Sequence, residues 1–211
     1  MLVIVDYGVG NLFSLQSSFA FIGTKAIVSG DSEVIAKADR LILPGVGAFA
    51  DAAEKLKKDN LDQLLIQKAA EGTPIMGICL GMQMLFEKSM EYGIHKGLGL
   101  IHGNVCPIQD RIPRNLKIPH IGWNALNFTG EKHPIFRYIK EGDYVYFVHS
   151  YAGMDCESST IATTEYGVPL TASVAKENVC GCQFHPEKSG RVGLNILRGF
   201  CEWNGKERGV I

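Results

Sequence analysis

A cysteine between two glycines is the strongest chemical signal in the chain. The segment Gly77–Gly81 reads G-I-C-L-G, follows the apolar run Pro74–Ile78 and precedes a helical pattern. A nucleophile in such a turn between a strand and a helix forms a nucleophile elbow, where glycines permit the tight backbone and the helix N-terminus favours a thiolate. Cys79 is therefore the candidate nucleophile. For these five residues alone, a buried structural cysteine between incidental glycines is the competing interpretation.

A histidine and a carboxylate two residues apart could activate this cysteine. His185 and Glu187 flank a proline directly after an apolar segment. A cysteine nucleophile needs a base, and the base needs a group that orients it. Residues two apart in an extended segment point the same way, so Glu187 can approach the imidazole. The segment alone also fits a surface turn, but the elbow favours a triad of Cys79, His185 and Glu187.

A glycine-rich turn could complete the site. Pro44–Gly47 follows the apolar run Leu41–Leu43. A backbone of this kind at the carboxyl end of a strand can expose N–H groups to a developing oxyanion. By itself the segment fits a plain strand-terminating turn equally well. All three candidate segments, however, stand at predicted strand ends, where one active site could gather them.

The first half of the chain has the elements needed to position these groups. Short apolar runs alternate with helical patterns, and Asn11 is a plausible N-cap for the first helix. The predicted strands are Leu2–Asp6, Ala26–Val28, Arg40–Leu43 and Pro74–Ile78, and the predicted helices after the third strand are Phe49–Lys57 and Leu61–Glu71. This alternation predicts a parallel sheet covered on both faces.

The second half has a different character, with many short strands between residues 97 and 175. They include Lys117–Ile121, Tyr144–His149 and Leu170–Ala175, and they precede a strand at Val179–Phe184 and a closing helix at Val192–Trp203. The predicted fold class is α/β: a mostly parallel central sheet flanked by helices, with added antiparallel strands in the C-terminal half. We expect a single domain over residues 1–211, with a solvated charged tail at Lys206–Arg208.

The composition excludes several classes of function. The net charge is −1, so we expect neither a nucleic-acid nor a membrane partner. The N-terminus lacks the basic region of a signal peptide, and no apolar run approaches the roughly 20 residues that span a bilayer. The six cysteines are irregularly spaced, as in reduced thiols of the cytoplasm. We expect no metal and no cofactor.

These residues also resemble a known family. The elbow followed by Met82-Gln83, together with the F-H-P-E segment 184–187, is similar to the signatures of the class I (triad) glutamine amidotransferases. More narrowly, the chain resembles the family of glutaminase subunits of imidazole glycerol phosphate synthase. That resemblance extends from the first strand to near the last helix, through segments 6–11, 43–47, 119–124, 146–151 and 185–190.

The resemblance implies a fold of this class and a division of labour. Cys79 would attack the side-chain amide of glutamine, His185 would protonate the departing ammonia, and Glu187 would orient His185. The remaining implied residues form three groups: an oxyanion hole from Leu80, Val46 and Gly47; substrate-binding residues Gly45, Gln83, Ser150 and Tyr151; and partner-interface residues Asn11, Trp123, Asn124 and Lys188. For Trp123, a core or rim position is the alternative.

The resemblance also implies a partner, a (β/α)8-barrel cyclase subunit in a heterodimer. Ammonia would be channelled to that subunit, which would make imidazole glycerol phosphate and aminoimidazole carboxamide ribonucleotide in histidine biosynthesis. Three alternatives stay open. They are a paralogous glutaminase subunit serving surface-sugar amidation, a regulatory subunit with a silent site, and a free-standing hydrolase.

Overall fold

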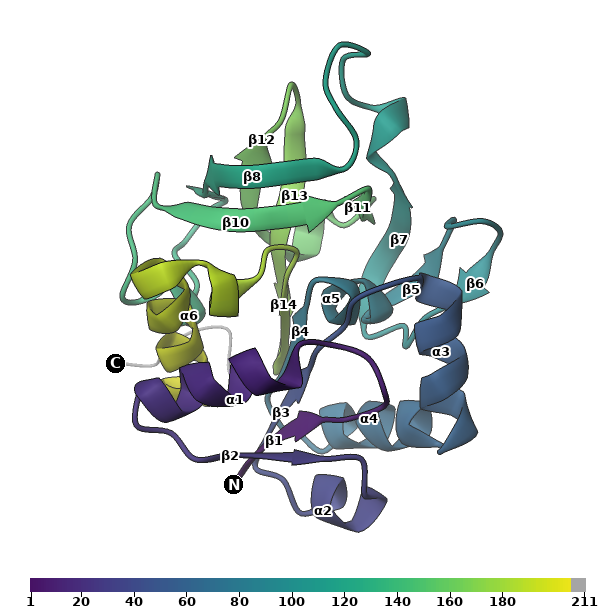
Figure 1. The fold of residues 1–211 in the computed structure, drawn as a ribbon, viewed down its shortest axis with the longest axis vertical. Coiled ribbons are helices and arrows are strands. Elements are labelled where there is room, and N and C mark those ends of the chain that lie inside the picture. Colours follow the sequence, from purple (N-terminus) through teal and green to yellow (C-terminus); the bar gives the residue numbers. More distant parts are fainter. Residues whose placement is uncertain (206–211) are drawn as a thin grey trace.

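The computed structural model describes residues 1–205 and contains a main sheet of eight strands. Counted in spatial order across the sheet, the first five strands run parallel and the last three are antiparallel (Figure 1). In spatial order they are β2 (Ala26–Ser29), β1 (Leu2–Val5), β3 (Arg40–Leu43), β4 (Ile75–Ile78), β14 (Val179–Cys182), β13 (Pro169–Lys176), β12 (Thr160–Glu165) and β9 (Asn127–Phe128). The predicted fold class is confirmed.

Helices cover both faces of the parallel half of the sheet (Figure 1). They are α1 (Leu12–Phe21), α2 (Ser32–Ala36), α3 (Phe49–Lys58), α4 (Leu61–Ala70), α5 (Leu80–Met84) and α6 (Gly190–Glu202). Alternate residues of a strand point to opposite faces. In β1, Ile4 packs in the core that includes Phe19 of α1 and Phe200 of α6, whereas Val3 packs in the core that includes Leu56 of α3.

Two smaller sheets stand beside the main one. A ribbon pairs β8 (His120–Ala125) with β10 (Tyr144–His149), and a four-stranded sheet has the order β11 (Tyr151–Met154), β7 (Ile101–Pro107), β5 (Phe86–Ser89) and β6 (His95–Lys96). Within residues 1–205, four 3-10 turns complete the elements: η1 (Ile108–Asp110), η2 (Pro134–Phe136), η3 (Glu157–Ser159) and η4 (Pro186–Lys188). The ribbon is joined to the end of β14, because the His185 N–H donates to the Tyr146 carbonyl oxygen at 2.9 Å.

The sequence-based element boundaries were wrong in a few places. The strand predicted at Lys117–Ile121 instead begins at His120 and continues to Ala125, because Pro119 has no N–H to donate to a ladder. The strand predicted at Val179–Phe184 ends at Cys182. The predicted tail Lys206–Arg208 lies outside the described residues, so the single domain over 1–211 stays a prediction. Within residues 1–205, no helix combines the length and apolarity needed to cross a bilayer.

Candidate active site

Three neighbouring parallel strands bring the candidate segments together. β3, β4 and β14 are adjacent in the sheet, and the turn after β3, the cysteine after β4 and the histidine segment after β14 all leave from their carboxyl ends. Ligands bind at this edge of open α/β sheets. The local sequence thus supplies each segment, and strand order makes them neighbours.

The elbow needs its glycines for steric reasons. A Cβ on Gly77 would lie 2.5 Å from the carbonyl oxygen of Gly81, and a Cβ on Gly81 would lie 1.8 Å from that of Leu43. Cys79 itself has φ 54° and ψ −112°, a conformation that residues with side chains rarely adopt. The backbone N–H of Cys79 donates to the Cys182 carbonyl oxygen at 2.7 Å. The strained turn is therefore held by the neighbouring strand.

The histidine stands between the sulfur and a carboxylate. Nδ1 of His185 lies 2.8 Å from Oε1 of Glu187, and both side chains are almost fully buried. Burial by itself lowers the pKa of His185. Hydrogen bonds to Cys79 and Glu187 and the negative charge of both groups outweigh burial and raise that pKa to about 9. His185 therefore carries a proton at neutral pH beside the Cys79 sulfur.

The turn after β3 packs directly under the elbow. The Tyr7 hydroxyl donates to the Pro44 carbonyl oxygen at 2.6 Å, and burial followed by the charge of Cys79 raises the pKa of Tyr7. A Cβ on Gly45 would lie 2.7 Å from the Gly81 nitrogen. Beyond Gly45, Val46 and Gly47 line the cavity described next. Tyr7 thus fixes the base of the segment from which oxyanion donors would come.

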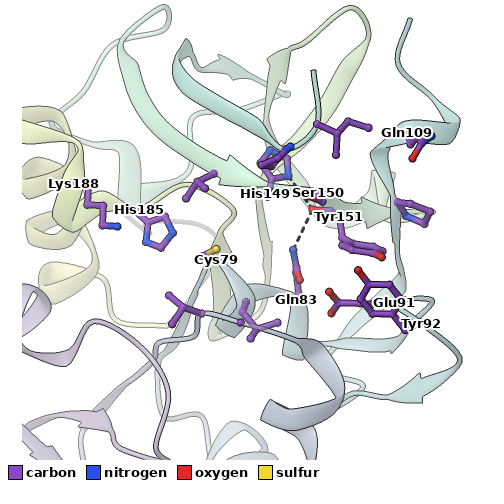
Figure 2. A pocket seen from close by; sticks show the side chains of 17 residues that line it. Cys79, Gln83, Glu91, Tyr92, Gln109, His149, Ser150, Tyr151, His185 and Lys188 are labelled. Carbon is purple, nitrogen blue, oxygen red and sulfur yellow. Dashed lines mark hydrogen bonds between the residues drawn. The ribbon is translucent and has the colours of Figure 1, made fainter. Parts of the chain in front are cut away.

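A cavity of about 720 Å³ opens over the cysteine. Figure 2 shows Cys79 between His185 on one side and Gln83 on the other. The predicted site residues that line the cavity are Val46, Gly47, Cys79, Leu80, Gln83, Ser150, Tyr151, His185 and Lys188. Gly45 is buried beneath it instead, and Glu187 lies behind His185. The volume is in the range of pockets for small molecules.

Sequence reasoning missed other residues of the cavity, including Glu91, Tyr92 and Gln109 (Figure 2). Glu91 follows β5, and its Oε2 accepts a hydrogen bond from the Phe49 N–H at 2.6 Å. Nothing in the local sequence singles out this loop carboxylate, because only the tertiary fold brings it to the cavity. Among residues 1–205, no cluster of three or more His, Cys, Asp or Glu side chains could hold a metal ion.

His120 and His149 form a chain of hydrogen bonds beside the ribbon. Nδ1 of His120 lies 2.9 Å from Nε2 of His149, whose Nδ1 donates to the Tyr151 carbonyl oxygen at 2.8 Å. Nε2 of His120 lies 2.8 Å from Oδ1 of Asn124. Sequence reasoning did not foresee that His149 also lines the cavity. Asn124, predicted at an interface, thereby supports the ribbon.

Of the other predicted interface residues, Trp123 and Lys188 lie at the ribbon, whereas Asn11 lies at the start of α1. Trp123 is 52% exposed, and its ring packs edge-on against Tyr146 at 6.0 Å between centroids. Nζ of Lys188 lies 6.0 Å from the centre of the same tyrosine ring. The core position given as an alternative for Trp123 is therefore wrong, whereas the rim position stays open. Asn11 caps α1 by accepting from the Ser14 N–H at 3.4 Å.

Comparison with known proteins identifies close relatives of this sequence. A family model described as glutamine amidotransferase class-I matches residues 3–202. The chain is 52% identical over 202 residues to the imidazole glycerol phosphate synthase subunit HisH of Lactococcus lactis subsp. lactis, covering 95% of this chain and 98% of that one. It is 48% identical over 205 residues to the HisH subunit of Sulfurimonas denitrificans, covering 96% and 98%.

Solved structures share the fold at much lower sequence identity. A crystal structure of a glutamine amidotransferase aligns with a TM-score of 0.75 at 17% identity, over 97% of this chain and 98% of that one. The structure of PurLQS from Thermotoga maritima aligns with a TM-score of 0.74 at 19% identity, over 95% and 96%. At these identities the likeness concerns the fold alone.

Proposed function

The chain belongs to the class I glutamine amidotransferases and, within them, to the family of imidazole glycerol phosphate synthase HisH subunits, and from this membership we propose that it is the glutaminase subunit of that enzyme. Glutamine and water are converted to glutamate and ammonia. The observation that carries the proposal is that Cys79 and His185 line a cavity together, with the buried Glu187 hydrogen-bonded to His185.

The geometry supports a thioester mechanism. The Cys79 sulfur attacks the amide carbon of the glutamine side chain, and the carbon–nitrogen bond breaks as His185 gives its proton to the departing ammonia. Water then adds to the thioester, with the neutral imidazole accepting its proton, and glutamate leaves as the thiolate is restored beside the protonated imidazole. Glu187 keeps Nδ1 of His185 protonated, so Nε2 is the nitrogen that exchanges the proton.

The oxyanion formed in both steps needs donors from the backbone. We assign these to the Leu80 N–H at the start of α5 and to an N–H of Val46 or Gly47. The first N–H groups of a helix have no partner within the helix, which leaves Leu80 free for this use. All three residues line the cavity beside the sulfur.

The cavity also suits the amino-acid end of glutamine. Gln83, Ser150 and Tyr151 line it on the side away from His185, as does the carboxylate of Glu91 (Figure 2). A carboxylate is the natural partner of an α-ammonium group. Glu91 therefore joins the predicted substrate-binding residues, with Gly45 supporting the backbone beneath the elbow.

The exposed face of the β8–β10 ribbon is the surface that we assign to the cyclase subunit, a (β/α)8 barrel. Ile121, Trp123 and Tyr144 are each more than half exposed. Ile121 and Trp123 share one face of β8, and Tyr146 is the cross-strand partner of Trp123. Aromatic anchors of this kind concentrate binding energy at interfaces.

Lys188 connects this surface with the cavity, since it lines the cavity and contacts Tyr146. Ammonia released at Cys79 would leave past this side of the site into the partner. The reaction requires no cofactor, and as a step of histidine biosynthesis it belongs in the cytoplasm. The free state of all six cysteines agrees with a reducing compartment.

The test is glutamate release from glutamine, measured for the purified chain alone and with the cyclase subunit and its nucleotide ligand. We expect a weak basal rate that rises strongly in the complex and disappears in Cys79→Ala. High activity without the partner would indicate a free-standing hydrolase. A rate of glutamate release that does not change when the cyclase subunit is added would indicate a different amidotransferase partner.

A further inference from the structure

Gln183 is a buried side chain at the nucleophile to which the triad chemistry gives no role. It follows β14 directly and is 0% exposed. Its backbone N–H donates to the Ala172 carbonyl oxygen at 2.9 Å, which fixes it at the end of the sheet. Residues two apart in extended chain point the same way, so Gln183 and His185 can both approach Cys79 from this segment.

The Tyr151 carbonyl oxygen determines, through Gln83, how the Gln183 carboxamide is oriented. Nε2 of Gln83 lies 3.1 Å from the Tyr151 carbonyl oxygen, which can only accept a hydrogen bond. The same Nε2 lies 3.0 Å from the Gln183 side chain, whose nearest atom must therefore be the acceptor Oε1. The other atom, Nε2 of Gln183, then faces the Cys79 sulfur at 3.9 Å.

We propose that Gln183 is a positioning residue for the nucleophile, whose side-chain N–H holds the Cys79 sulfur in its attacking orientation and favours the negatively charged sulfur. The inference rests on the proposed function, in which that sulfur attacks glutamine. A donor stabilises an anionic acceptor more than a neutral one. Because Gln183 is fully buried, water does not compete for its side-chain N–H.

The same contact determines what Gln83 offers the substrate. One N–H of Gln83 goes to Gln183 and the other to the Tyr151 carbonyl oxygen. The atom that remains for a ligand is the acceptor Oε1. Gln83 therefore selects a substrate group that donates hydrogen bonds, such as the α-ammonium of an amino acid.

The experiment measures alkylation of Cys79 by iodoacetamide as a function of pH, with the modified peptide quantified by mass spectrometry. Gln183→Met keeps an unbranched side chain of similar length but removes the donor. We expect its alkylation profile to move to higher pH by about half a unit to one unit, the equivalent of one hydrogen bond. Gln183→Glu, which turns an oxygen toward the sulfur, should move the profile further in the same direction.

The matched control is Ser173→Ala on β13. The Ser173 hydroxyl is equally buried and donates to the Gly181 carbonyl oxygen of the same strand end, at 2.5 Å, without contacting Cys79. Its alkylation profile should match that of the wild type. A wild-type profile in Gln183→Met, or an equal shift in Ser173→Ala, would overturn the positioning role.

A second measurement needs no variant at this position and covers the case in which both Gln183 variants fail to fold. In the ¹⁵N-labelled wild-type chain, the side-chain amide resonance of Gln183 should shift with the pH midpoint of Cys79 alkylation. In Cys79→Ser this pH-dependent shift of the resonance should be absent. A Gln183 resonance that does not change with pH in the wild-type chain would refute the contact. These readouts require neither glutamine nor the cyclase. The two failures are therefore distinguishable: loss of partner-stimulated glutaminase activity would count against the proposed function, whereas an unchanged alkylation profile in Gln183→Met would count against the contact between Gln183 and Cys79.

Discussion

Glu187→Gln tests the charge of the triad with almost no change of shape. Oε1 of Glu187 accepts from Nδ1 of His185 at 2.8 Å, whereas Oε2 is buried with no hydrogen-bond partner among the described residues. A glutamine can keep its carbonyl oxygen on Nδ1 and put its amide nitrogen where Oε2 now lies. The substitution therefore preserves the tautomer of His185 and removes only the negative charge.

The size of the effect follows from the kind of hydrogen bond that is lost. A hydrogen bond to a charged group contributes about 1.5–3 kcal/mol and a neutral one about 0.5–1.5 kcal/mol. The difference of about 1.4 kcal/mol corresponds to about one pKa unit. The pKa of His185 should fall by that amount from its value of about 9. Since the orientation of His185 survives, we expect kcat to fall about 10-fold, the rate equivalent of about 1.4 kcal/mol.

Two assays check this prediction. NMR titration of the His185 ring nitrogens in the free chain measures the pKa, and glutamate release in the complex measures kcat. Glu202→Gln is the matched control, because Glu202 accepts hydrogen bonds from Arg198 and Tyr138 at the surface. A Glu187→Gln chain with wild-type kcat and an unchanged His185 titration would refute the argument that this carboxylate acts through its charge.

Three further predictions concern stability and assembly. The pKa of His185 is raised from 6.5 to about 9 in the folded chain, so its protonation stabilises the fold fully below about pH 6.5 and ceases to do so as pH rises through about 9. Urea unfolding should therefore give a lower free energy of unfolding at pH 9.5 than at pH 6. The difference between the two pH values should be smaller in Glu187→Gln. Tyr7→Phe leaves the buried Pro44 carbonyl without its donor and should lower the free energy of unfolding by about 1–3 kcal/mol. Glutaminase activity should fall as well. A variant as stable as the wild type in a urea titration would count against the role of Tyr7. Trp123→Ala should weaken cyclase binding about 30-fold, as measured by titration calorimetry. Phe21 is an 80% exposed aromatic at the far end of α1, so Phe21→Ala should leave binding unchanged. Equal losses of affinity in the two variants would remove Trp123 from the interface.

Local spacing is why the candidate catalytic segments stand out in the sequence. The glycines around Cys79 demand a tight turn, and the two-residue interval between His185 and Glu187 puts both side chains on one side of the chain. Both are short-range properties of the backbone. The strand–helix alternation of the first half likewise follows from apolar runs, and it predicted the parallel sheet.

Strand boundaries were harder because they depend on which partner a strand finds. β8 begins at His120, after the residue that cannot donate a backbone hydrogen bond, and continues to Ala125 because β10 pairs with it throughout. β14 ends at Cys182, the last residue in register with β4. No local pattern specifies these registers.

The sequence by itself predicted a nucleophile and an acid–base partner, and it determined the class of sheet that carries them, because each depends on neighbours within a few residues. Only the tertiary structure decided that Glu91 and His149 line the same cavity, that Gln183 faces the sulfur, and that Trp123 is exposed. These contacts join segments far apart in the chain. They arise from strand order and register, and no spacing along the sequence encodes them.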